Sequence, residues 1–136
     1  MAHISYSEMK DWAFCAFYHK LTRIDKVQGF KGNAFTAFGT AVHTICERKL
    51  LKKKANEETF VQEFEKCLDR LDDDVQVDQK LVDDMRQQGQ LIVPEIEGAL
   101  SEYFKDFEVV AVELPLHEPI GDEADYNFKG FIDAIV

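Results

Sequence analysis

The final ten residues read Asn127-Phe128-Lys129-Gly130-Phe131-Ile132-Asp133-Ala134-Ile135-Val136. Apolar side chains dominate this run, which predicts a buried β-strand that carries a single acid, Asp133. A carboxylate on an apolar strand is costly to bury unless a cation or hydrogen-bond donors compensate its charge. We therefore look for a second polar group, elsewhere in the chain, that could share a metal ion with Asp133.

The best candidate for that second group is His43, in the segment Phe38-Gly39-Thr40-Ala41-Val42-His43. A helix is predicted from residue 33 or 34 to about residue 54, and His43 lies next to its apolar side. The small residues Ala37, Gly39, Thr40 and Ala41 crowd the middle of this helix, and a helical glycine costs about 1 kcal/mol relative to alanine, so we expect another element to approach closely there. An isolated histidine in this setting is either a satisfied boundary residue or a metal ligand.

A second predicted strand precedes the last one. Residues 107–116 are rich in β-branched residues, and residues 119–125 form a turn-type connection. The two strands most simply form an antiparallel hairpin, covered by helices on one face only. Glu113 then lies on the strand beside the one that carries Asp133, either as an outward-facing edge acid or as a further site residue.

The opening residues predict a helix. Ser5 and Glu8 fit a capping box, and the helix is expected to run to about Tyr18. Its predicted buried stripe consists of Met9, Trp12, Ala13, Ala16 and Phe17.

Helical periodicity also accounts for most of the chain between the first helix and residue 106. A polar loop is predicted over residues 25–32. One further helix begins after Asn56 and ends in the acidic run 72–74, which is typical of a solvated helix end rather than of a calcium site. Another spans about residues 78–104, kinked or split by Pro94.

Length and composition indicate one domain over residues 1–136. The chain is 46% hydrophobic and contains 11 phenylalanines, enough for a proper core. No run approaches the roughly 20 apolar residues of a membrane span, and the N-terminus lacks the layout of a signal peptide, so we expect a cytoplasmic protein. Three widely spaced cysteines without a Cys-x-x-Cys motif argue against a disulfide framework and a self-contained zinc site.

Charge is distributed unevenly along the chain. Residues 1–55 carry a net charge of +6 and residues 56–136 a net charge of −16, within a total of −10. A basic first part beside an acidic second part is typical of a protein in which one face meets phosphates. The run Lys52 to Lys54 has a second interpretation, because cations at the end of a helix are favoured by its dipole.

Three stretches together resemble the RecB-like exonuclease branch of the PD-(D/E)XK nuclease superfamily, which includes bacterial and phage exonucleases and CRISPR adaptation nucleases. They are residues 4–15, residues 38–43, and residues 112–133, and a Gly-x-x-x-His helix is followed some 90 residues later by a Gly-x-x-Asp strand. The resemblance implies a mixed α+β fold: N-terminal helices, then a β-hairpin, in an incomplete restriction-endonuclease-like core. It also implies a metal-dependent DNA nuclease or exonuclease, a hydrolase of phage or bacterial DNA replication, recombination or repair.

The same resemblance assigns roles to the acids and the histidine. His43 and Asp133 map onto residues that bind a divalent cation, Mg²⁺ or Mn²⁺. Glu113 corresponds to an acid often present on the preceding strand, so the implied catalytic set is Asp133, His43 and Glu113. Carboxylate oxygen suits both cations, and Mn²⁺ also tolerates imidazole.

One part of the family pattern does not occur in the sequence. The strand after Asp133 should supply an Asp/Glu-x-Lys, and no lysine follows Asp133. We therefore expect this chain to be the N-terminal part of a longer parent, or a missing segment or second chain to complete the site. The alternative is a catalytically inactive nuclease-like domain that binds DNA or a protein, and a third is a helical domain with a hairpin and no site.

Two further expectations come from the resemblance. Cys15 aligns with the first cysteine of family members that hold an iron–sulfur cluster, but a cluster needs four ligands and the C-terminal cysteines of that pattern are missing, so none is expected in this chain. Tyr6, Phe17 or Phe30 would stack on an unpaired base. The cations expected to contact DNA are Lys10, Lys20, Arg23, Lys26 and Lys31.

Overall fold

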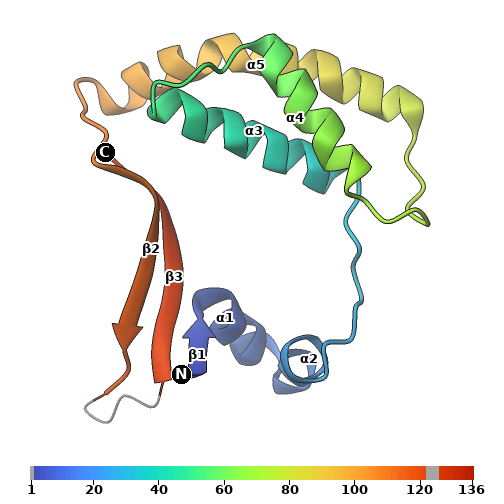
Figure 1. Cartoon of the computed structure of the whole chain (residues 1–136), viewed down its shortest axis with the longest axis vertical. Coiled ribbons are helices and arrows are strands. Elements are labelled where there is room, and N and C mark those ends of the chain that lie inside the picture. The colour runs from blue at the N-terminus through green and yellow to red at the C-terminus, as the bar shows by residue number, and fades with distance from the viewer. Residues whose placement is uncertain (1, 122–125) are drawn as a thin grey trace. The chain divides into compact units, whose positions relative to one another are not determined.

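A computed structural model of the protein describes residues 2–121 and 126–136. The chain folds into two compact units, coloured by residue number in Figure 1. One unit combines Met1–Phe30 with Glu113–Ile135, and the other comprises Lys31–Val112 together with Val136. The unit built from helices is therefore inserted between the two halves of the unit that contains the sheet. The single domain predicted over residues 1–136 stays a prediction.

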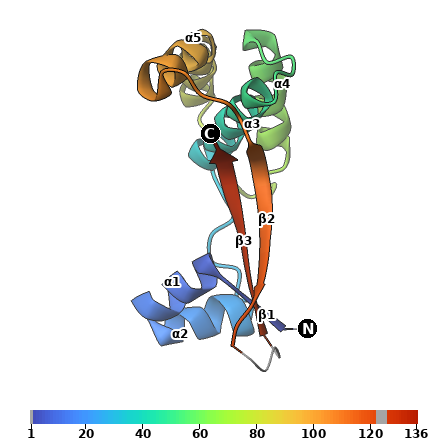
Figure 2. The ribbon, with the colours of Figure 1, turned by 90° about the vertical axis from the view of Figure 1, so that its left-hand side faces the viewer.

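The sheet-containing unit has three strands rather than the predicted two. The order in the sheet is β1-β3-β2, with β1 (Ala2–Ser5) parallel to β3 (Tyr126–Ile135). β2 (Ala111–Pro119) runs in the opposite direction to β3, as Figure 2 shows. The antiparallel pair of strands was predicted correctly, whereas the parallel strand β1 was missed. Residues 122–125 of the predicted turn lie outside the described residues.

Helix α1 (Tyr6–Phe14) begins where the sequence predicts and ends earlier. The Ser5 side chain accepts a hydrogen bond from the Glu8 N–H at 3.1 Å, which is the expected cap. The prediction of one helix to Tyr18 was wrong, because Cys15 adopts an extended conformation, with φ −164° and ψ 115°. Cys15 thereby ends α1 and precedes the short helix α2 (Ala16–His19) and a π-helical turn, η1 (Lys20–Ile24).

The predicted buried stripe of the first helix is exposed. Met9, Trp12 and Phe17 retain 51%, 63% and 65% of their accessible surface, and neither α1 nor α2 contains a buried residue. The 3.6-residue period correctly identifies an apolar side of the helix. It does not identify what packs there, and that prediction was therefore wrong.

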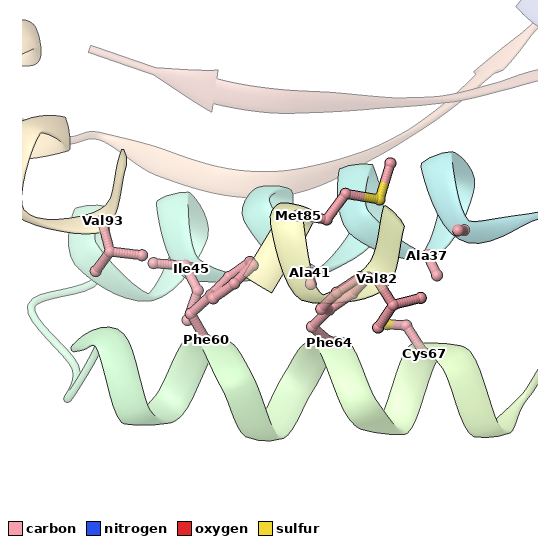
Figure 3. Packing of buried hydrophobic residues seen from close by; sticks show 10 residues of the cluster. Ala37, Ala41, Ile45, Phe60, Phe64, Cys67, Val82, Met85 and Val93 are labelled. Carbon is pink, nitrogen blue, oxygen red and sulfur yellow. The ribbon is translucent and has the colours of Figure 1, made fainter. Parts of the chain in front are cut away.

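The helical unit consists of α3 (Ala34–Leu50), α4 (Glu57–Asp69) and α5 (Gln79–Phe104), each in contact with the other two. Pro94 lies inside α5, which continues through it as one element. Side chains from all three helices interdigitate, as Figure 3 shows for the labelled residues. The buried hydrophobic core consists of Ala34, Ala37, Ala41, Ile45, Phe60, Phe64, Cys67, Val82, Met85 and Val93.

The close approach expected at the small residues in the middle of α3 occurs at Ala37 and Ala41, which are buried in the core, and a tighter one occurs at Gly89 of α5. At Gly39 itself, no described atom lies within 4 Å of where a Cβ would be. A Cβ on Gly89 would lie 2.0 Å from two ring carbons of Phe60, which is fully buried. The glycine of α5 therefore makes room for the aromatic ring of α4.

The last strand is less buried than its composition predicts. None of the residues of β3 belongs to the buried class, and Asp133 is exposed. The prediction of a buried acid was wrong, because apolar composition alone does not supply a second layer over both faces of a strand. The observed combination of helices and a mixed sheet confirms the predicted α+β fold class.

No helix among residues 2–121 and 126–136 is both long and apolar enough to cross a lipid bilayer.

Candidate functional site

His43 and Glu47 form a close pair on α3. They are four residues apart, and side chains at that spacing lie on the same side of a helix. The Nδ1 atom of His43 lies 2.6 Å from Oε1 of Glu47, and 49% of the His43 side chain is exposed. The helix that presents them is fixed at its start by a capping box, in which Asn33 and Thr36 exchange hydrogen bonds of 2.9 and 3.0 Å.

The Glu47 carboxylate selects the ligand atom of His43. An imidazole that keeps its Nδ1 proton toward a carboxylate presents Nε2 as its basic nitrogen. Carboxylate partners of this kind fix the orientation of histidines that bind metals. The contact therefore prepares His43 for a cation at Nε2.

Glu47 is absent from the site residues predicted from the sequence. The sequence contains the signal that would have identified it, since Glu47 follows His43 at a spacing of four on a predicted helix. The amphipathic pattern of the helix places Glu47 away from the core, and for that reason alone it does not stand out as a site residue.

Asp133 and Glu113 lie on neighbouring strands, as predicted. The Ile120 N–H donates to the Tyr126 carbonyl at 3.0 Å, which joins β2 to β3. The two acids therefore come from adjacent strands of one sheet, with Asp133 exposed and Glu113 half-buried.

Glu113 has an unusual backbone conformation. Its φ is 51°, within a strand, where side chains other than glycine rarely occur. A left-handed residue in an antiparallel strand is typical of a β-bulge, which changes the direction of a side chain. Such conformations cost of order 1–3 kcal/mol and concentrate at functional sites. The strain at Glu113 therefore favours the interpretation as a site residue over that as an ordinary edge acid.

The donor atoms fit a divalent cation. The helical unit presents an imidazole held by a carboxylate, and the sheet presents two carboxylates on adjacent strands. Mg²⁺ and Mn²⁺ both prefer carboxylate oxygen, and Mn²⁺ accepts an imidazole nitrogen as well.

Three of the five cations predicted to contact DNA are paired with acids. Lys20 contacts Asp25 at 2.5 Å, and Arg23 contacts Asp11 at 2.6 Å. Lys31 lies 2.6 Å from a carboxylate oxygen in the acidic run 72–74, and this hydrogen bond raises the pKa of the lysine. These acids reduce the attraction of the three cations for phosphate.

The other two predicted cations differ from these three. The Lys10 ammonium lies 5.9 Å from the ring centroid of Tyr6, a cation–π contact. Lys26 has a positive φ of 52° and follows the π-helical turn. Tyr6, Phe17 and Phe30 are all exposed, as stacking on a base requires.

The cysteines have three different environments. Cys15 is exposed, Cys46 is half-buried and Cys67 is buried. Burial raises the pKa of both the Cys46 and the Cys67 thiols, which disfavours the thiolate that binds metals. Neither thiol is therefore prepared to join Cys15 as a cluster ligand.

Comparison with known proteins identifies the family to which this chain belongs. A family model described as the PD-(D/E)XK nuclease superfamily matches residues 3–136. No curated protein and no solved structure matches the chain. The matched region includes His43, Glu113 and Asp133 and covers nearly the whole sequence. The chain belongs to the PD-(D/E)XK nuclease superfamily.

Proposed function

We propose that the chain is a metal-dependent DNA nuclease domain that hydrolyses phosphodiester bonds. The observation that carries this proposal is the His43–Glu47 contact of 2.6 Å, on a chain that matches the nuclease family over residues 3–136. Its finer form is an exonuclease of the RecB-like branch that acts in replication, recombination or repair of phage or bacterial DNA, in the cytoplasm. That form rests on the motifs at residues 4–15, 38–43 and 112–133.

Within this proposal, His43 and Asp133 hold Mg²⁺ or Mn²⁺. A bound cation of this kind polarises the scissile phosphate and lowers the pKa of a coordinated water. Glu47 orients the imidazole of His43 through Nδ1. Glu113 provides a further carboxylate for the cation or its water, from the strand beside Asp133.

The remaining family residues, an acid and a lysine in an Asp/Glu-x-Lys motif, do not occur after Asp133 in this sequence. We propose that a further segment or a second chain supplies them. The acid would complete the ligand set, and the lysine would align the attacking water. Without them the cation is under-coordinated and hydrolysis is slow.

Calorimetric titration with Mn²⁺ tests the ligands directly. We expect His43→Ala and Asp133→Ala each to weaken binding at least tenfold. Two matched controls, His117→Ala and Glu118→Ala, remove an exposed histidine and an exposed acid from β2 and should leave binding unchanged. Equal binding by the parent and by both site variants would reject the assignment.

Hydrolysis is tested separately, on linear DNA in the presence of Mn²⁺. The proposal predicts a slow release of nucleotides that EDTA abolishes and that Asp133→Ala lacks. A parent chain that binds Mn²⁺ through His43 and Asp133 and cuts nothing would reject hydrolysis by this chain and favour the inactive binding module.

A catalytically inactive DNA- or protein-binding module is the second candidate. The observation that favours it is the exposed apolar surface of α1 and α2, where Met9, Trp12 and Phe17 retain 51%, 63% and 65% of their accessible surface. This candidate predicts DNA binding that needs no divalent cation and no hydrolysis under any metal. Mn²⁺-dependent cleavage that is lost in Asp133→Ala would exclude it.

A further inference from the structure

A cluster of cations ends α3 and has no part in the proposed metal site. We propose that Lys52, Lys53 and Lys54 bind the phosphates of the DNA strand that leads to His43. This inference rests on the proposed nuclease function and specifies the path of its substrate. These three lysines are not among the five cations that the sequence analysis predicts to contact DNA.

The first argument is charge. Residues 48–54 contain five cations, and two of these are held by acids of the neighbouring helices. Arg48 contacts Glu63 of α4 at 3.2 Å, and Lys49 contacts Glu97 of α5 at 3.0 Å. Lys52, Lys53 and Lys54 are exposed, and no acid of the described chain lies within ion-pair distance of them. Three consecutive unpaired cations therefore face solvent.

The second argument is a groove beside these cations. It has a volume of about 430 Å³ and is lined by Thr44, Glu47, Arg48, Leu51, Lys53 and Lys54. It begins one residue after His43 and reaches the lysines. The rise of a helix is 1.5 Å per residue, so residues 43 to 50 span about 10 Å. At 3.4 Å per nucleotide along a DNA strand, that length corresponds to about three nucleotides.

The third argument is the backbone that holds the lysines. The Lys52 N–H donates to the Lys49 carbonyl at 3.0 Å, and the Lys53 N–H donates to the Arg48 carbonyl at 2.8 Å. These two bonds form a Schellman motif, whose left-handed position is usually glycine. Lys52 occupies that position with a φ of 54°. The motif fixes the direction in which the chain presents the cations.

The helix dipole is the competing explanation for these lysines. The dipole favours cations in the last turn, where Arg48 and Lys49 already lie. It does not account for a lysine in a left-handed position that glycine would occupy with less strain. Lys52, Lys53 and Lys54 follow the last residue of α3, and binding of an anion accounts for three exposed cations there.

Substitution of Lys52 by glycine separates stability from binding. Lys52→Gly removes one charge and relieves the positive φ, so we expect a higher melting temperature together with weaker DNA binding. Lys105→Gly is the matched control, because Lys105 also ends a helix with a positive φ, 57°, and its replacement changes the charge by the same amount. The control should raise stability without weakening DNA binding.

The main measurement is fluorescence anisotropy with a 20-nucleotide oligothymidylate and a 20-base-pair duplex, in EDTA, over a series of salt concentrations. Each lysine–phosphate contact contributes about 0.7 to 0.9 to the slope of log K against log salt. The triple variant Lys52→Gln/Lys53→Gln/Lys54→Gln should lower that slope by about 2 and weaken binding at low salt by about tenfold. An unchanged slope would overturn the inference.

The two proposals fail separately in these experiments. Binding in EDTA that depends on the three lysines, without hydrolysis in Mn²⁺, would keep the phosphate path and reject the nuclease. Hydrolysis in Mn²⁺ with a slope unaffected by the triple variant would keep the nuclease and reject the path. The circular dichroism spectrum of the triple variant checks that α3 still folds.

Discussion

Replacement of Gly89 by alanine should destabilise the helical unit through a single clash. The new methyl group would lie 2.0 Å from Cε1 and Cζ of Phe60, where ordinary contact begins at 3.4 Å. The ring has no room to move, because it is fully buried, stacked on Phe64 at 5.8 Å and in edge contact with Phe38 at 5.8 Å. The backbone of α5 must therefore shift instead.

The magnitude follows from two opposing terms. Overpacking a dense core costs about 1–3 kcal/mol, and a clash of this size against a fixed ring belongs at the upper end. Alanine is favoured over glycine in a helix by about 1 kcal/mol. We therefore expect Gly89→Ala to lower the free energy of unfolding by about 2 kcal/mol, the difference between these two estimates.

The matched control is Gly98→Ala, on the same helix. No described atom lies within 4 Å of its new methyl group, so the only expected effect is the greater helix propensity of alanine. Gly98→Ala should raise the free energy of unfolding by about 0.5–1 kcal/mol. Urea denaturation followed by circular dichroism measures both, at an unchanged denaturant slope. Equal shifts of the same sign in the two variants would refute the packing of Phe60 against Gly89.

Three further predictions concern local interactions. Asn56→Ala should lower the free energy of unfolding by about 1 kcal/mol, because the Asn56 side chain caps α4 by accepting a hydrogen bond from the Thr59 N–H at 3.0 Å. An unchanged urea midpoint would show that the cap contributes nothing. Iodoacetamide should label the exposed Cys15 first and the buried Cys67 slowly. Burial raises the pKa of the Cys67 thiol, so the stability that the protonated thiol contributes is present below pH 9 and is lost as the pH rises through the pKa of Cys67 in the folded protein. Asp74→Asn should lower the pKa of Lys31 toward its ordinary value, measured by NMR titration, and no change would exclude the hydrogen bond as its cause.

Elements specified by neighbouring residues were predictable from the sequence. The start of α4 after Asn56, the start of α3 and the extent of α5 follow from caps and from apolar periodicity, which act within a few residues. The adjacent strands that carry Glu113 and Asp133 follow from a turn between two β-branched runs. His43 stands out in the sequence as an imidazole beside the apolar side of its predicted helix, four residues after Gly39, and its role as a ligand stays a prediction.

Features that depend on distant partners were not predictable. The sequence of residues 2–5 indicates only a segment that precedes a helix. These residues form a strand because they pair with β3. The close approach at Gly89 depends on where a ring of another helix falls, and periodicity contains no such information. Glu113 has a left-handed conformation within β2, and nothing in the local sequence indicates it.

The parallel pairing of β1 with β3 determines the order in which the protein can fold. Ala2 lies opposite Tyr126, so the sheet joins residues separated by almost the whole chain, and closing so long a loop is entropically unfavourable. The helices between them need only residues 31–112 and are complete in the nascent chain before β3 is synthesised. At roughly 5–20 residues per second, synthesis leaves β1 without its strand partner for several seconds. We therefore expect the pairing of β1 with β3 to be a late step in folding, after the helical unit has formed.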